Sequence, residues 1–66
     1  KHMKEIVSYQ VIDLKDRWMG SYNAGLKHST PPLEMAIQNA TQSKGIVYAI
    51  YNDGEREEVY RPKNTK

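Results

Sequence analysis

Residues 45–62 read Gly-Ile-Val-Tyr-Ala-Ile-Tyr-Asn-Asp-Gly-Glu-Arg-Glu-Glu-Val-Tyr-Arg-Pro, and we expect the rest of the chain to assemble around this segment. Asp53-Gly54 between two β-prone runs predicts a hairpin, with a type I′ turn that needs positive φ at both residues. The first run is apolar on both pleat faces, which is typical of a central strand covered on both sides. The second run carries charges throughout, which predicts an edge strand guarded against further pairing.

The chain before this hairpin predicts another one. Residues 4–13 alternate between apolar and polar, as a half-buried strand does. Residues 13–16 supply turn chemistry, and residues 17–24 form the returning strand. If the loop is those four residues, the pairs are Val11 with Trp18, Tyr9 with Gly20 and Val7 with Tyr22. That register places a tyrosine ring over a strand glycine, which replaces the missing side chain.

The segment between the hairpins predicts one helix over residues 31–44. Thr30 is the expected N-cap, and Pro31 takes the first helical position, where its missing N–H costs nothing. Leu33, Ala36, Ile37 and Ala40 recur at helical spacing and form one apolar stripe. Lys44 closes the last turn, and Gly45 is the expected left-handed residue after the helix.

The fold class is therefore α+β, a four-stranded antiparallel sheet in β-β-α-β-β order with the helix packed on one face. The helix is expected to pack through Leu33, Ile37 and Ala40 onto the first hairpin at Val7, Tyr9, Val11 and Trp18. Of the two faces of strand 46–51, the one with Ile46, Tyr48 and Ile50 is favoured for this contact because its apolar volume is larger. Residues 3–62 form one domain, residues 1–2 read as an expression scar, and residues 63–66 as a frayed tail.

Composition restricts the function. The chain has 66 residues, no cysteine and a net charge of +2, so it has no disulfide and no thiolate metal ligand. It carries no apolar run of membrane-spanning length and no signal peptide, so we expect a cytoplasmic protein without a membrane partner. His28 lies in a loop, and no carboxylate pair or glycine-rich phosphate loop is present. We expect no catalysis, no metal and no cofactor.

Protein–protein recognition is the favoured function, in a size class frequent among phage and mobile-element inhibitors of host proteins. The residue types typical of interfaces, together with one exposed loop, supply the candidate binding residues: Met19, Leu26, Lys27, His28, Val47, Tyr51, Arg56 and Tyr60. Nucleic-acid binding through basic and tyrosine side chains of the sheet is the alternative. A nucleotide or other small molecule held between subunits is a weaker one.

Self-association is expected as well. With Ile46, Tyr48 and Ile50 under the helix, the opposite face of the sheet carries six apolar residues: Ile6, Ile12, Met19, Val47, Ala49 and Tyr51. A soluble monomer seldom leaves a contiguous apolar patch of this kind exposed to water. The sequence therefore predicts a homodimer through that face, which Val47→Lys should split.

Overall fold

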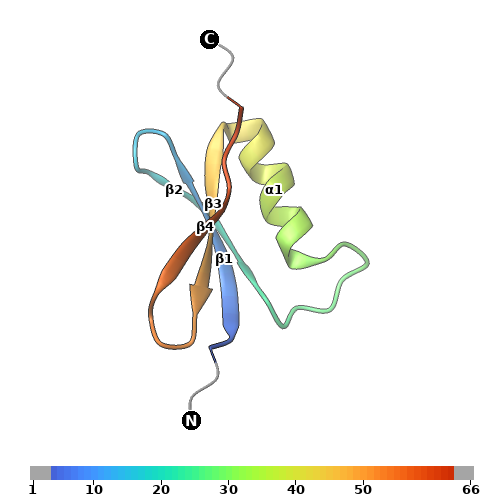
Figure 1. Ribbon diagram of the computed structural model, residues 1–66. Helices are drawn as coiled ribbons and strands as arrows, with labels where there is room; N and C mark the ends of the chain where they lie inside the picture. Colours follow the sequence, from blue (N-terminus) through green and yellow to red (C-terminus); the bar gives the residue numbers. More distant parts are fainter. Residues whose placement is uncertain (1–3, 64–66) are drawn as a thin grey trace.

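The computed structural model describes residues 4–63 and shows one open sheet of four antiparallel strands with one helix (Figure 1). The elements are β1 (Ile6–Asp13), β2 (Trp18–Asn23), α1 (Pro32–Ser43), β3 (Gly45–Tyr51) and β4 (Arg56–Tyr60). The strand order is β2-β1-β3-β4, so β3 is central and the charged β4 is an edge, as predicted. The α+β class is confirmed. The expectations for residues 1–2 and 64–66 lie outside the described residues.

Both hairpins close with the same three-residue loop, although their sequences differ. In the first, the Asp13 N–H donates to the Arg17 carbonyl at 2.9 Å, and Asp16 adopts φ 65°. In the second, the Tyr51 N–H donates to the Glu55 carbonyl at 2.8 Å, and Gly54 adopts φ 91°. This loop is a turn followed by one left-handed residue. The second hairpin is thus confirmed, but type I′ is wrong, because Asp53 keeps a negative φ.

The predicted register of the first hairpin is wrong. Val11 pairs with Gly20, Tyr9 with Tyr22 and Ile12 with Trp18, and Met19 is left as a bulge. The Asp13 carboxylate accepts the N–H groups of Lys15 and Arg17. The loop is therefore one residue shorter than expected. The bulge then shifts the pairing by one more residue. As a result Trp18 and Gly20 lie on opposite faces of the sheet.

Both helix ends differ from the prediction by one residue. Pro31 is the N-cap, with ψ 150° and no side-chain hydrogen bond, so Thr30 does not cap the helix. A residue before proline is pushed out of the α region, and Pro32 therefore forces Pro31 to remain extended. At the other end Lys44 is the left-handed residue, with φ 60°. Gly45 instead begins β3, where an added Cβ would lie 2.8 Å from Val11 Cγ1.

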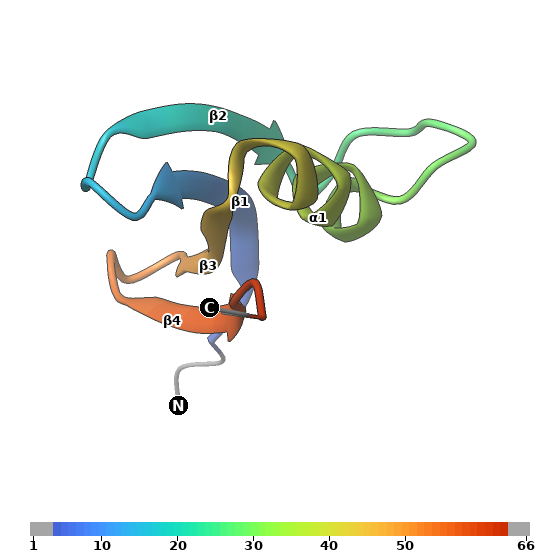
Figure 2. The ribbon, with the colours of Figure 1, turned by 90° about the horizontal axis from the view of Figure 1, so that it is seen from above.

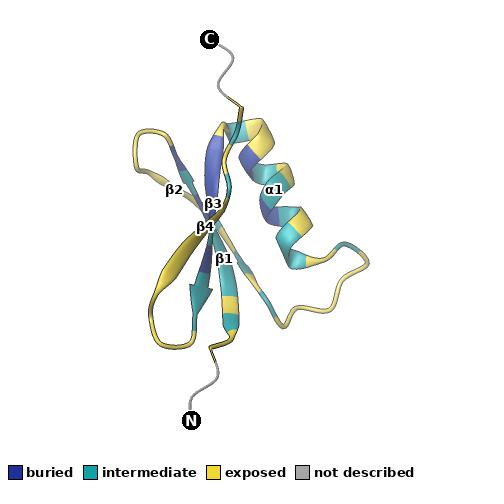
Figure 3. Ribbon diagram, viewed as in Figure 1, coloured by how far each residue is buried: buried dark blue, intermediate teal, exposed yellow. Residues whose placement is uncertain are grey.

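The core lies between α1 and the sheet, and Figure 3 shows the buried residues gathered in the helix and the central strands. Val11, Ala36, Ala40 and Val47 are fully buried, with partly buried neighbours around them: Tyr9, Tyr22, Leu33, Ile37 and Tyr60. The helix stripe and its contact with Tyr9 and Val11 are confirmed.

Two expectations about this packing are wrong. Val7 and Trp18 are 43% and 64% exposed and lie outside the core. The helix covers Val47 and Ala49 rather than Ile46, Tyr48 and Ile50, since Val47 belongs to the helix-side cluster and Ala49 pairs with Tyr9, which packs against that cluster. Ile46 is buried as well, at 7% exposure, but it pairs with Ile12 and lies outside this cluster. Ala36 and Ala40 of the helix pack with the short side chains of Val11 and Val47 in the buried cluster, and the tyrosines pack against this cluster.

Candidate functional site

The face of the sheet that turns away from α1, called the open face below, has no element of the described chain packed on it. Figure 2 shows α1 on one side of the curved sheet, with β2 and β4 at the two margins. Strand register assigns residues to the open face, since directly paired residues share a face. Its members are Ser8, Gln10 and Ile12 of β1, Trp18, Ser21 and Asn23 of β2, Ile46, Tyr48 and Ile50 of β3, and Arg56 and Glu58 of β4.

Apolar and aromatic side chains form a stripe that crosses the open face at the end next to the first hairpin loop and then follows β3. Trp18 is 64% exposed and pairs with Ile12, which in turn pairs with Ile46. Tyr48 and Ile50 are half-buried beside them. The polar Ser8, Gln10 and Ser21 lie between the β3 part of this stripe and the β2 edge. Apolar side chains bordered by polar ones are a usual feature of protein interfaces.

The charged side chains at the β4 side of the open face are held in position by contacts with neighbouring side chains. The Arg56 guanidinium lies 4.4 Å from the centroid of the Tyr48 ring, a cation–π contact. Arg61 donates two hydrogen bonds of 2.8 Å to Glu58. These bonds, together with the positive charge of Arg61, hold the pKa of Glu58 below its usual value. The β4 margin of the open face is therefore charged but locally balanced.

The first hairpin loop contains a second ion pair, between Asp13 and Arg17. Asp13 is buried, and it accepts a 2.8 Å hydrogen bond from Arg17 Nε in addition to the two backbone N–H groups. The backbone N–H of Arg17 lowers the pKa of Asp13 most, and the Arg17 side chain adds to the effect. Lys4 pairs with Glu55 at the opposite end of the sheet. Asp13 thus serves to build the loop that places Trp18.

The candidate binding residues are dispersed over the molecule. Arg56 is the one that lies on the open face. Met19 is the partly exposed bulge of β2, and Leu26, Lys27 and His28 are exposed in the loop before α1. Tyr51 donates its hydroxyl to Glu57, which raises the pKa of Tyr51, and its ring lies beneath Lys4. Tyr60 and Val47 belong to the core on the helix side.

The burial of Val47 overturns the dimer surface predicted from the sequence. Val47 and Ala49 are fully buried, and Ile12 points to the other face with Ile46. The six residues of that predicted patch therefore do not form one surface. Trp18 and Tyr48 were missed as candidates, because the predicted register and face assignment placed both under the helix.

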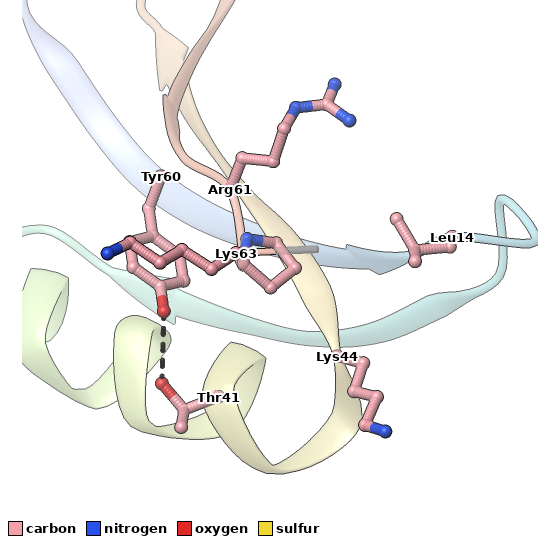
Figure 4. A pocket seen from close by; sticks show the side chains of 7 residues that line it. Leu14, Thr41, Lys44, Tyr60, Arg61 and Lys63 are labelled. Carbon is pink, nitrogen blue, oxygen red and sulfur yellow. Dashed lines mark hydrogen bonds between the residues drawn. The ribbon is translucent and has the colours of Figure 1, made fainter. Parts of the chain in front are cut away.

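A pocket of about 380 Å³ lies at the C-terminal end of α1 (Figure 4). Thr41, Lys44, Tyr60, Arg61 and Lys63 line it together with Leu14 and Pro62. The Tyr60 and Thr41 hydroxyls lie 3.4 Å apart, whereas the Lys44 and Arg61 side chains point away from one another. Arg61 is also engaged by Glu58. Charges that do not converge give a nucleotide phosphate no common site, so this pocket does not support the small-molecule alternative.

Among residues 4–63, no three His, Asp or Glu side chains gather closely enough to hold a metal ion. None of these residues belongs to a helix with the length and apolar character needed to span a bilayer. Comparison of the chain with protein-family models, curated proteins and solved structures gave no significant match. The functional assignment therefore rests on the physical character of the open face.

Proposed function

We propose that this chain is a small non-enzymatic binding protein that recognises a protein partner through its open face. The observation that carries the proposal is the 64% exposure of Trp18 beside the half-buried Ile12. Tryptophan, tyrosine and arginine dominate the binding energy of protein interfaces, and the open face holds all three in Trp18, Tyr48 and Arg56. When a partner covers a large exposed aromatic ring at the edge of an apolar stripe, the ring contributes a large share of the binding free energy.

The charge distribution favours a protein over a nucleic acid. Lys4, Arg17 and Arg61 are each engaged by a carboxylate, and Glu58 lies on the open face itself. Lysines that make no ion pair within residues 4–63 lie in loops or at element ends, as Lys15, Lys27, Lys44 and Lys63 do. Phosphate binding needs several uncompensated cations on one surface. The open face has aromatic rings on which bases could stack, but it lacks several uncompensated cations.

Binding without catalysis suits a chain of this size, since occlusion of a surface on a larger protein requires only affinity. Inhibition of a host protein, as small phage and mobile-element proteins perform it, is the biological role that we propose for such binding. The support for this role is the size class and the exposed recognition surface, an analogy rather than a resemblance in fold.

The test compares two exposed apolar residues. Leu14, at the tip of the first hairpin, is 63% exposed, almost as much as Trp18, but lies off the open face. A partner captured from lysate by the tagged wild-type chain should bind Trp18→Ala at least about tenfold more weakly. Leu14→Ala should bind normally, and circular dichroism should show both variants folded. Equal affinity of the two variants would contradict the proposal.

The nucleic-acid alternative is tested with the same protein. Short duplex and single-stranded oligonucleotides are titrated at low and moderate salt. We expect no binding at moderate salt. Micromolar binding that weakens steeply with salt would replace the proposed function with nucleic-acid recognition.

A further inference from the structure

The two edges of the sheet differ in chemistry. The β4 edge presents Arg56, Glu57 and Glu58, and Pro62 follows it in the chain. Charges and proline of this kind are the usual protection of an edge strand against pairing. The sequence of β2 is Trp-Met-Gly-Ser-Tyr-Asn, without a charge or a proline. The β2 edge therefore lacks side-chain protection against another strand.

Backbone geometry identifies which groups of β2 point outward. Ala24 donates its N–H to the Val7 carbonyl at 2.9 Å, in the same register as Tyr9 with Tyr22. Antiparallel pairs alternate between bonded and non-bonded, so Tyr22 and Gly20 bond to β1. Ser21, between them, directs its N–H and C=O away from the sheet.

The neighbours of Ser21 on this edge are partly used. The Met19 carbonyl accepts a long bond of 3.4 Å from Asn39 Nδ2, and the Asn23 carbonyl accepts the Leu26 N–H at 3.1 Å. Within residues 4–63, no hydrogen bond outside the sheet ends on the Ser21 backbone. Ser21, at the centre of residues 19–23, is thus the residue whose outward N–H and C=O are both unused outside the sheet in the described part of the chain.

We propose that the β2 edge pairs with the β2 edge of a second copy of this chain, antiparallel, about a twofold axis at Ser21. In that register the two Ser21 residues exchange their N–H and C=O groups, and Met19 of each copy faces Asn23 of the other. Directly opposed residues keep a common face, because Ser21 lies on the open face in both copies. The joined sheets form one sheet of eight strands.

The residues of the two edge strands favour a second copy of this chain as the partner that pairs with β2. In a twofold contact a strand pairs with the identical strand of the second copy, so that it faces its own residue types. At β2 this opposes only neutral residues, whereas at β4 it would oppose Glu57 and Glu58 to their own copies. The buried hydrophobic residues are also few, and three of the six are alanines. An unstapled chain with so small a core is commonly stabilised by association.

This dimer is independent of the proposed function, because the open faces of both copies remain uncovered. It replaces the sequence-based dimer, because Val47 and Ala49 of the surface predicted for that dimer are buried under α1. Joining at β2 places the two open faces on the same side of one sheet, so that a partner protein meets a doubled recognition surface. A monomer would leave the proposed function intact.

The test is the molar mass of the purified chain by light scattering from about 1 μM to about 1 mM, a range that covers tight and weak association. The mass should rise to twice the 7.6 kDa of one chain. Ser21→Pro removes the outward N–H without removing a bond to β1, and should give a monomer. Ser21→Ala keeps the backbone groups and should remain dimeric. A monomeric wild type over the whole range would overturn the proposal.

A second pair of variants keeps the test valid if the proline variant does not fold. Ser21→Lys places two cations opposite one another at the axis and should split the dimer. Val59→Lys adds the same charge at an exposed position of the opposite edge strand and should leave the dimer intact. A dimer that survives Ser21→Lys, or that Val59→Lys splits, would exclude the β2 edge as the interface.

Discussion

Val47→Ala is the substitution that tests most sharply which face of the sheet the helix covers. Val47 is fully buried beneath α1 and pairs with Val11 on one side and Tyr60 on the other. Loss of two buried carbons costs about 1.6 kcal/mol at about 0.8 kcal/mol each. The unfilled space adds about 1 kcal/mol, because a close-packed core relaxes only in part. We expect a loss of about 2–3 kcal/mol in the free energy of unfolding.

The control for Val47→Ala is Ile50→Ala on the open face. Ile50 is only half-buried, so its truncation should cost about 1 kcal/mol and leave no enclosed cavity. Urea unfolding at one protein concentration gives both values, with an unchanged m-value expected for each variant. In a thermal melt Val47→Ala should lower Tm by roughly 8–24 °C, since each kcal/mol shifts a domain of this size by about 4–8 °C. An Ile50→Ala loss equal to or larger than that of Val47→Ala would refute this packing.

Other predictions concern the helix end and the first loop. Gly45→Ala should destabilise by about 1–3 kcal/mol, because the new Cβ meets the fully buried Val11 at 2.8 Å. Lys44→Gly should stabilise by roughly 0.5–1 kcal/mol in urea unfolding, since Lys44 holds φ 60°. The pKa of Asp13 is lowered by folding, so stability should fall from about pH 5 to about pH 2, and Asp13→Asn should flatten that part of the Tm profile. A larger pH slope in Asp13→Asn would contradict the Arg17 interaction.

The sequence was sufficient for the elements that depend on local pattern. The apolar run of β3 predicted a central strand, and the helical spacing of Leu33, Ala36, Ile37 and Ala40 predicted the side of α1 that meets the sheet. Charges on β4 predicted an edge. Each of these features follows from periodicity or composition over a few neighbouring residues.

The face of β3 under the helix was not predictable from apolar volume, because both faces of this strand are apolar. The face under the helix is the one whose Val47 packs with Ala36 and Ala40 of α1 in the buried cluster. This is a property of two elements together, and the sequence of β3 alone does not contain it.

Trp18 was misplaced for a different physical reason. The loop of the first hairpin closes on a left-handed Asp16 and is one residue shorter than expected, so Trp18 pairs with Ile12 instead of Val11. This one-residue shift moves Trp18 to the other face, whereas the Met19 bulge behind it returns Gly20 and Tyr22 to the face that was predicted for them. The candidate site depends on this register, so its principal residue was assigned to the core. An Asp at the end of the loop, able to adopt positive φ, was the available signal.

Binding of a protein partner through the open face can be measured with the single tryptophan of the chain. Trp18 is exposed on the open face, so its fluorescence in the free protein should be readily quenched by acrylamide. Addition of the captured partner protein, prepared without intrinsic tryptophan fluorescence, should shift the emission to shorter wavelength and reduce quenching several-fold. Binding that leaves both the emission and the quenching of Trp18 unchanged would show that the partner contacts another surface.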